Sequence, residues 1–174
     1  MGARLARAAI VTGSDSGIGK ATAIALAEAG CDVGVTWHRD EDGAEDTAAA
    51  VRAAGGKAVV ARLDVAALED AARVIDRLAD DLGRLDVLVN NAGTGIGAPF
   101  LEVALQDWQQ VLDTDPRTVE RPGIPLGRPG HAREIASAIA WLASEEAGYA
   151  TGASFVVDGG LLLVAARHNR ERAR

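Results

Sequence analysis

Cysteine is nearly absent from this 174-residue sequence, and the one present, Cys31, excludes an intramolecular disulfide framework. The three histidines are not grouped with it at the spacing of a zinc site, so no metal site is predicted. No apolar run approaches the length that crosses a membrane, and no stretch typical of a signal peptide precedes the first glycine-rich turn. We therefore expect a cytoplasmic protein that does not bind a membrane.

Positive charge is also in short supply. The formal net charge is -7, which excludes nucleic acid as a general partner because an acidic surface repels a phosphate backbone. A small-molecule ligand is the better expectation. The hydrophobic content of 48% is enough for one core, so we expect a single domain over residues 1–164 and a basic tail over 165–174.

Strand-like and helix-like patterns alternate along the first half of the chain. Short apolar runs predict strands over residues 8–11, 32–37, 57–63 and 85–89. Apolar residues at helical spacing predict helices over residues 18–29, 41–54 and 68–82. Such alternation is typical of an α/β domain with a parallel sheet.

The second half is less regular. Four prolines between residues 114 and 130 exclude a long helix or an internal strand there, and such a long irregular connection is uncommon in a compact domain. A helix is predicted over part of 105–113 and another over 131–144, where Trp108 and Trp141 are expected to pack against the sheet. A final strand is predicted over 154–157.

The segment from Thr12 to Gly19 joins the first strand to the first helix and carries three glycines, Gly13, Gly17 and Gly19. Glycine permits a tight turn and lets backbone approach a ligand closely, and the N–H groups at a helix N-terminus favour a negative charge. The segment therefore predicts a phosphate-binding turn. Lys20 follows it and is expected either to contact a phosphate or to be exposed.

Further motifs follow in order: Leu63-Asp64-Val65, then Asn90-Asn91-Ala92-Gly93, then Thr151-Gly152, then Asp158-Gly159-Gly160. Together with the glycine turn, they resemble the short-chain dehydrogenase/reductase family. The resemblance implies a Rossmann-like, doubly wound parallel sheet and hydride transfer between a nicotinamide cofactor and a carbonyl or secondary alcohol. It implies these cofactor-binding residues: Gly13, Ser14, Ser16, Gly17, Ile18, Gly19, His38, Arg39, Asp64, Val65, Asn90, Ala92 and Gly93. For Asp64, a helix cap is the alternative role.

The same resemblance shows a gap. In the family, a fifth strand carries a catalytic serine, the next helix carries Tyr-x-x-x-Lys, and a sixth strand follows; here residues 113–115 run directly into 116–118, which resemble the far end of the family's substrate loop. The family's catalytic asparagine would align near Asp115. The one tyrosine, Tyr149, has Ala153 four residues later and is expected to pack structurally. We therefore predict an internal deletion of strands 5 and 6, and assign no catalytic residue.

Cofactor choice is expected at the end of the second predicted strand. A carboxylate there favours the ribose 2′-hydroxyl of NAD, and a basic side chain favours the 2′-phosphate of NADP. The chain has Trp37-His38-Arg39 at this point. Because Arg39 can pair with a phosphate, the sequence favours NADP(H) over NAD(H).

Three functional hypotheses remain open. The chain is an oxidoreductase by lineage whose activity is impaired, or a non-catalytic NADP(H)-binding or interaction module, or a deletion product whose exposed sheet edge promotes association. Homo-oligomer formation through residues 131–160 is possible in each. With strands 5 and 6 gone, we expect the strand over 154–157 to move beside the fourth strand, because the segment between them supplies a helical crossover.

Overall fold

The computed structural model describes residues 7–93 and 124–162. Its four strands are all parallel and lie in the order β3-β2-β1-β4. Their bounds are β1 (Arg7–Val11), β2 (Cys31–Trp37), β3 (Ala58–Arg62) and β4 (Val87–Val89). The Rossmann-like sheet expected from the sequence is confirmed, and the described residues contain no fifth or sixth strand.

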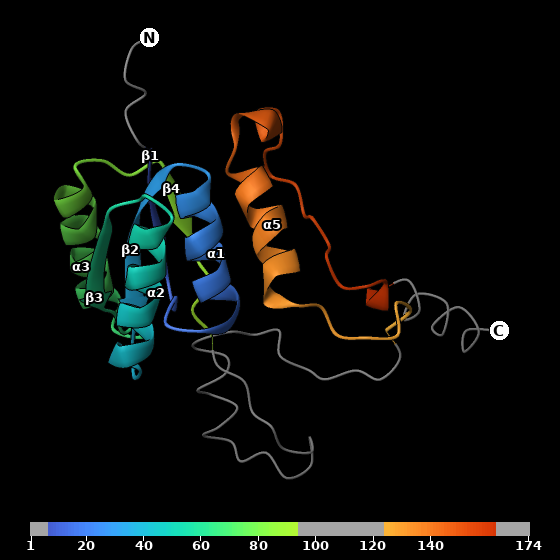
Figure 1. The fold of residues 1–174 in the computed structure, drawn as a ribbon, viewed down its shortest axis with the longest axis horizontal. Coiled ribbons are helices and arrows are strands. Elements are labelled where there is room, and N and C mark those ends of the chain that lie inside the picture. The colour runs from blue at the N-terminus through green and yellow to red at the C-terminus, as the bar shows by residue number, and fades with distance from the viewer. Residues whose placement is uncertain (1–6, 94–123, 163–174) are drawn as a thin grey trace.

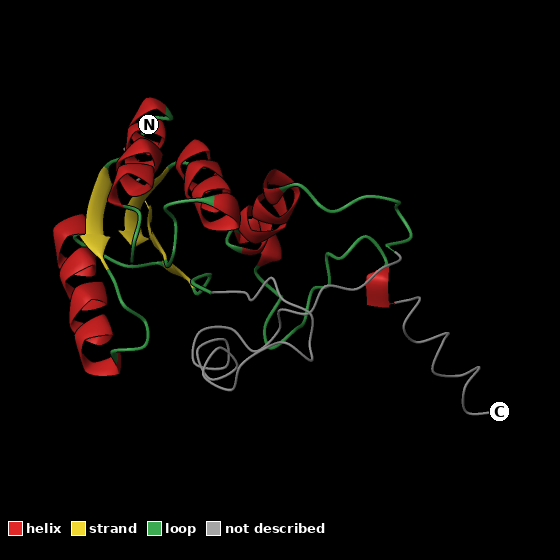
Figure 2. Cartoon of the chain, turned by 90° about the horizontal axis from the view of Figure 1, so that it is seen from below, coloured by secondary structure: helices red, strands yellow, loops and turns green. Residues whose placement is uncertain are grey.

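The helices lie on both faces of this sheet (Figure 1). Their bounds are α1 (Gly17–Glu28), α2 (Glu41–Ala53), α3 (Leu68–Leu82) and α5 (Ala132–Leu142), followed by the short 3-10 helix η2 (Glu145–Ala147). Figure 2 shows the strands between α3 on one side and the other helices on the opposite side. The four predicted helices in the described residues are confirmed, and no end differs from the prediction by more than two residues.

Side-chain alternation along the strands divides the core between the two faces. Ala9, Val11, Val33 and Val35 share one buried cluster with Leu26 of α1 and Val51 of α2. On the other face, a Cβ at Gly34 would lie 2.9 Å from Ile10 Cγ1 and 3.6 Å from Leu78 Cδ1. Gly34 therefore leaves the space in which Ile10 and Leu78 of α3 are buried.

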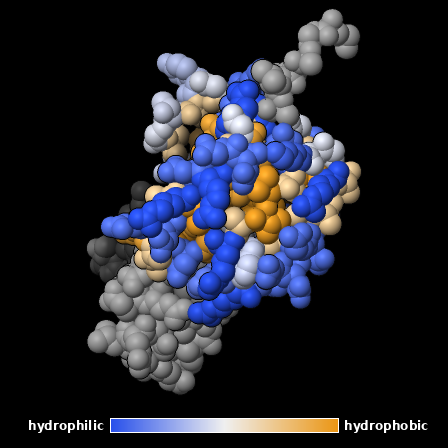
Figure 3. Space-filling view, turned by 90° about the vertical axis from the view of Figure 1, so that its left-hand side faces the viewer, coloured by the Kyte–Doolittle hydropathy of each residue, from blue (hydrophilic) through white to orange (hydrophobic). Residues whose placement is uncertain are grey.

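The outer face of α3 is solvated. Arg73 pairs with Glu69 at 3.7 Å and with Asp70 at 2.7 Å along this helix. Figure 3 views the molecule from this side and shows a largely hydrophilic surface, with hydrophobic atoms visible near its middle. Among the helices of the described ranges, none is long and apolar enough to span a membrane.

The C-terminal part of the described chain is anchored through α5, which packs against α1. The start of α5 is held by Glu134, whose Oε2 accepts a hydrogen bond from the His131 N–H at 2.7 Å. Both Glu134 oxygens also accept hydrogen bonds of 2.8 Å from the Arg128 guanidinium. These bonds, Arg128 first, lower the pKa of Glu134 from 4.5 to about 2.

The expected strand over residues 154–157 is not formed, and its predicted move beside the fourth strand is wrong. This segment follows η2 and lies beyond α5, away from the sheet, in both ribbon views. The physical reason is that α5 stays packed on α1, so the chain that leaves α5 does not reach the open side of β4. A strand exists only where a neighbour completes its hydrogen bonds.

Three further expectations in the second half have clear outcomes. Residues 124–131 contain no helix or strand, as the prolines predicted, whereas the helix expected within 105–113 and the residue Trp108 lie outside the described residues. Trp141 is partly exposed and packs edge-to-face on Phe155, not on the sheet, with ring centroids 5.9 Å apart. Tyr149 is fully exposed, so the packing role expected for it is wrong.

Candidate functional site

The turn between β1 and α1 requires glycine at two positions for different reasons. Gly13 has φ of +60°, and a Cβ there would lie 2.9 Å from Ala92 Cα. A Cβ at Gly19 would collide with the Gly13 carbonyl oxygen and lie 2.5 Å from Asn91 Nδ2. The turn therefore packs directly against the backbone that follows β4, and larger residues would push the two apart.

Thr12 fastens the chain that leaves β4 to the chain that leaves β1. Its Oγ1 accepts hydrogen bonds of 2.9 Å from the N–H groups of Asn91 and Ala92, and donates to the Val89 carbonyl at 3.3 Å. One hydroxyl thus satisfies two backbone donors just beyond β4. The carboxyl ends of two neighbouring strands are held together at the edge where ligands of parallel sheets bind.

Asn91 completes this connection through its side chain. Its Nδ2 donates to the carbonyl oxygens of Thr12 and Gly13, at 2.9 Å each. The neighbouring Asn90 is exposed and makes no side-chain hydrogen bond to another described residue. The sequence motif predicts Asn90 as the cofactor-binding residue, whereas the structure places the Asn91 amide at the turn. The alternation of side chains along a strand does not distinguish the two, because both follow the end of β4.

Ser14 has a structural role and does not line the pocket. It is fully buried, its Oγ donates to the Val11 carbonyl at 2.8 Å, and the same oxygen accepts from the Thr36 N–H at 2.9 Å. Thr36 Oγ1 in turn accepts from the Gly13 N–H at 3.0 Å. These bonds join the end of β1 to β2 and fix the path of the turn, while the Ser14 side chain faces away from solvent.

The N-terminus of α1 is open to an anion. Its N-cap residue, Ser16, makes no side-chain capping bond, and its first turn contains no acidic residue. By contrast, α2 is capped by Asp40, whose Oδ1 accepts from the Gly43 N–H at 2.9 Å, and has Glu41 and Asp42 in its first turn. The uncapped N–H groups and the positive end of the α1 dipole leave a place for negative charge.

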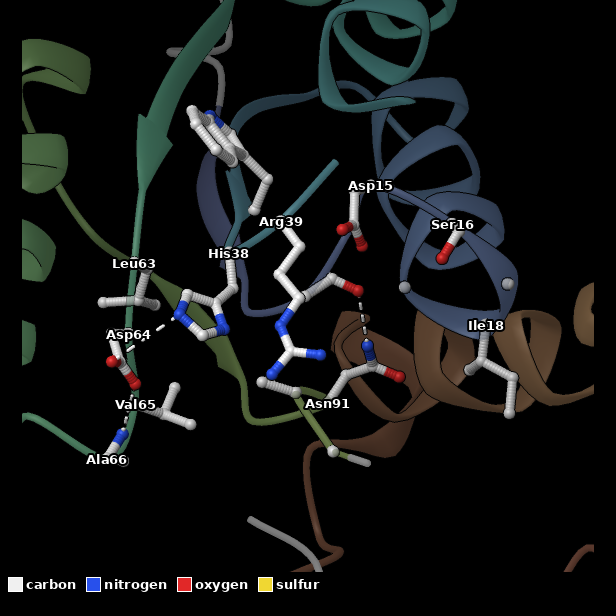
Figure 4. Close-up of a pocket in the computed structure, with 16 residues that line it drawn as sticks. Asp15, Ser16, Ile18, His38, Arg39, Leu63, Asp64, Val65, Ala66 and Asn91 are labelled. Carbon is white, nitrogen blue, oxygen red and sulfur yellow. Dashed lines mark hydrogen bonds and ion pairs between the residues drawn. The ribbon is translucent and has the colours of Figure 1, made fainter. Parts of the chain in front are cut away.

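A pocket of about 520 Å³ lies over this turn, at the carboxyl ends of the strands (Figure 4). Of the residues predicted to bind cofactor, eleven line it: Gly13, Ser16, Gly17, Ile18, Gly19, His38, Arg39, Asp64, Val65, Ala92 and Gly93. Ser14 and Asn90 do not. The structure adds Asp15, Trp37, Leu63, Ala66 and Asn91 to the lining.

The wall formed by the ends of β2 and β3 carries the charged groups. His38 Nε2 lies 3.6 Å from Asp64 Oδ2, and Asp64 Oδ1 accepts from the Ala66 N–H at 3.0 Å. Asp64 therefore closes a short turn and does not cap α3, whose N-cap is Ala67. Arg39 extends into the pocket in Figure 4 and forms no ion pair with a described residue.

None of the described residues that line the pocket is a tyrosine or a lysine. Tyr149 lies two residues after the end of η2, which is at the end of the molecule opposite the carboxyl ends of the strands (Figure 1). Lys57 is also engaged elsewhere, because its Nζ donates to the Asp81 carbonyl at 2.6 Å. Within residues 7–93 and 124–162, no three or more histidine, cysteine or carboxylate side chains lie close enough together to hold a metal ion.

Comparison with protein families places this geometry in context. The family model described as short chain dehydrogenase matches residues 7–119, and the one described as enoyl-(acyl carrier protein) reductase matches residues 116–162. Uncharacterized oxidoreductase YohF of Escherichia coli is 32% identical over 253 residues, covering 96% of this chain and 100% of that protein. The 3-oxoacyl-[acyl-carrier-protein] reductase of Synechocystis is 41% identical over 113 residues, 65% of this chain and 46% of that protein.

Solved structures also resemble this chain. Acetoin dehydrogenase from Enterobacter cloacae superposes with a TM-score of 0.81 at 34% identity, covering 93% of this chain and 97% of that chain. The 253-residue alignment with YohF is longer than this 174-residue chain, so part of YohF has no counterpart here. The two family models meet at residues 116–119, next to the seam expected at 113–116. The sequence motifs, the sheet order and these similarities establish that the chain belongs to the short-chain dehydrogenase/reductase family.

Proposed function

We propose that this member of the short-chain dehydrogenase/reductase family binds NADP(H) in the pocket over the β1–α1 turn, and that its capacity for hydride transfer is impaired. The observation that carries the proposal is the combination in one pocket of an uncapped helix N-terminus and an arginine that forms no ion pair with a described residue. The family uses nicotinamide cofactors. The choice of NADP(H) over NAD(H) depends on the charges at the end of β2.

The residues present fit a dinucleotide. A Cβ at Gly17 would meet no atom within 4 Å, so the surface beside the first turn of α1 is open to a pyrophosphate. The pocket volume of about 520 Å³ lies in the range of small-molecule sites. Gly17 and the N–H groups that follow it would hold the phosphates, and Asp64, Val65 and Ala92 would lie beside the adenosine part.

The charges next to β2 favour a 2′-phosphate. Arg39 supplies a guanidinium that no described carboxylate pairs with, and it can bind a phosphate through two hydrogen bonds. The nearest following carboxylate, Asp40, is already used as the cap of α2. A ribose 2′-hydroxyl therefore has no free carboxylate at this strand end, whereas a phosphate has a cation.

The impairment follows from proton transfer. A bound nicotinamide supplies or accepts a hydride, and the carbonyl or alcohol must gain or lose a proton at the same time. A tyrosine hydroxyl performs this step near neutral pH only when a neighbouring cation lowers its pKa. Tyr149 is fully exposed and no lysine stands four residues after it. We therefore propose a nucleotide-binding module with little or no turnover.

The alternative is retained activity. YohF carries the name of an oxidoreductase and the Enterobacter cloacae structure that of an acetoin dehydrogenase, so a small carbonyl or secondary alcohol is the substrate class to test. We also propose a cytoplasmic location, in keeping with the buried free thiol of Cys31. Association through residues 131–160 is part of the same proposal.

The test is calorimetric titration of the whole chain with NADPH and with NADH. We expect NADPH to bind more tightly, and Arg39→Gln to weaken NADPH binding by about tenfold or more, or about 1.4 kcal/mol, with little change for NADH. Arg52→Gln is the matched control, since this exposed arginine lies on α2 and pairs with Glu45. Equal affinities, or equal losses in the two variants, would contradict the proposal. NADPH oxidation with acetoin that exceeds the background rate would contradict the impairment.

A further inference from the structure

The open edge of β4 is the first of two unsatisfied features in the described structure. β4 pairs with β1 on one side, and no described strand pairs with its other side. Leu88 stands in register with Ile10 of β1, so both side chains lie on the face that carries α3. Ile10 is fully buried, but Leu88 is 45% exposed. An inner strand of a parallel sheet is normally covered on both faces.

The second feature is the segment Phe155, Val156 and Val157. These three residues are 50%, 61% and 47% exposed, although aromatic and β-branched residues favour paired strands. Their backbone makes no hydrogen bond to another described residue. Phe155 packs on Trp141 of α5, and Val156 is the most exposed of the three.

The two features match each other. Each consists of three consecutive apolar residues bounded by polar ones: Asp86 and Asn90 flank β4, and Ser154 and Asp158 flank the second segment. Neither contains a lysine, a proline or an inward charge, which are the devices that keep strand edges from pairing. Within one chain, α1 and α5 lie between the segment and the sheet (Figures 1 and 2).

We propose that two copies of this chain associate by reciprocal strand pairing, in which residues 155–157 of each copy pair with the open edge of β4 in the other. A two-fold arrangement satisfies both edges and closes the assembly, because the same two surfaces meet twice. Val156 of one copy then covers Leu88 of the other on the α3 face. This inference specifies the association through residues 131–160 proposed above by naming the strands that meet, and it does not depend on cofactor binding.

The first test is sedimentation velocity of the whole chain over a range of concentrations. We expect a dimer for the native chain, and a dissociation constant raised about tenfold or more by Val156→Pro, which removes a backbone donor from the pairing. Val156→Thr is the matched control, since it keeps the N–H and the branched shape. Leu88→Lys should weaken the dimer as strongly, whereas Leu68→Lys, at an exposed position on α3, should leave it intact.

The second test identifies which residues of the two copies lie next to each other, and it does not require the proline variant to fold. A chain with Leu88→Cys is mixed under oxidising conditions with a chain carrying Val156→Cys, both in a Cys31→Ala background. A disulfide forms only where the two Cα atoms lie within about 7 Å, so strand exchange predicts a crosslinked heterodimer. Three results would overturn the proposal: a monomer at all concentrations without crosslinking, a dimer unaffected by Leu88→Lys and Val156→Pro, or a disulfide within one chain that carries both cysteines.

Discussion

Replacement of Asn91 by alanine tests the connection between β4 and the glycine turn. The change removes both hydrogen bonds from Nδ2, to the carbonyl oxygens of Thr12 and Gly13, while the bond from the Asn91 N–H to Thr12 Oγ1 remains. A partly buried hydrogen bond between neutral groups contributes about 0.5–1.5 kcal/mol. We therefore expect Asn91→Ala to lower the free energy of unfolding by about 1–3 kcal/mol, with a Tm lower by about 2–4 °C for each kcal/mol.

The neighbouring asparagine supplies the control. Asn90 is exposed and its side chain makes no hydrogen bond to a described residue, so Asn90→Ala should change the free energy of unfolding by no more than about 0.5 kcal/mol. Asn91→Asp should be at least as destabilising as Asn91→Ala, because it directs a carboxylate at two carbonyl oxygens in place of a donor. Urea denaturation followed by circular dichroism measures all three. Equal effects at positions 90 and 91 would refute the role assigned to Asn91.

Gly19→Ala should destabilise the fold by about 1–3 kcal/mol in urea denaturation, because the added Cβ would collide with the Gly13 carbonyl oxygen. Gly30→Ala is the control, because Gly30 has a positive φ but open space around it, so this variant measures the cost of backbone strain alone. Thr22→Val should leave stability unchanged or raise it by about 1 kcal/mol, because the buried Thr22 hydroxyl has no hydrogen-bond partner in the described structure; a loss above about 1 kcal/mol would show a missed partner. The pKa of Glu134 is lowered from 4.5 to about 2 by Arg128, so the folded state holds this proton less tightly than the unfolded state. Stability present above pH 4.5 should therefore be lost as pH falls toward 2, and Glu134→Gln should flatten that part of a pH series of unfolding curves.

The first half of the fold was predictable because its signals are local. The apolar run before Thr12 and the helical spacing after Gly17 each indicate one element, and a parallel sheet follows from their alternation. The glycine turn was predictable for the same reason. Gly13 and Gly19 face close contacts with adjacent segments, and Gly17 leaves the surface beside α1 open.

The second half was not predictable to the same degree. The run from Phe155 to Val157 has the composition of a strand, but a strand needs a partner, and composition does not say whether one is within reach. Residue type does not distinguish Asn90 from Asn91. Only the path of the backbone beyond Val89 directs the Asn91 amide to the turn and the Asn90 amide to solvent. The sequence predicts Ser14 as part of a phosphate-binding turn, but its hydroxyl forms hydrogen bonds with the backbone of β1 and β2.

The sequence by itself determined the family, the presence of the first four strands, the position of the glycine turn and the lack of a Tyr-x-x-x-Lys pair, because these depend on residue identity and spacing along the chain. The tertiary structure decided which side chains line the pocket, and it left α1 without a side-chain cap, beside an Arg39 that forms no ion pair within the described ranges. It also kept residues 155–157 apart from β4. The last of these outcomes depends on how α5 packs against α1, a contact between residues more than a hundred positions apart in the chain. Local sequence patterns carry no information about a packing contact of that kind.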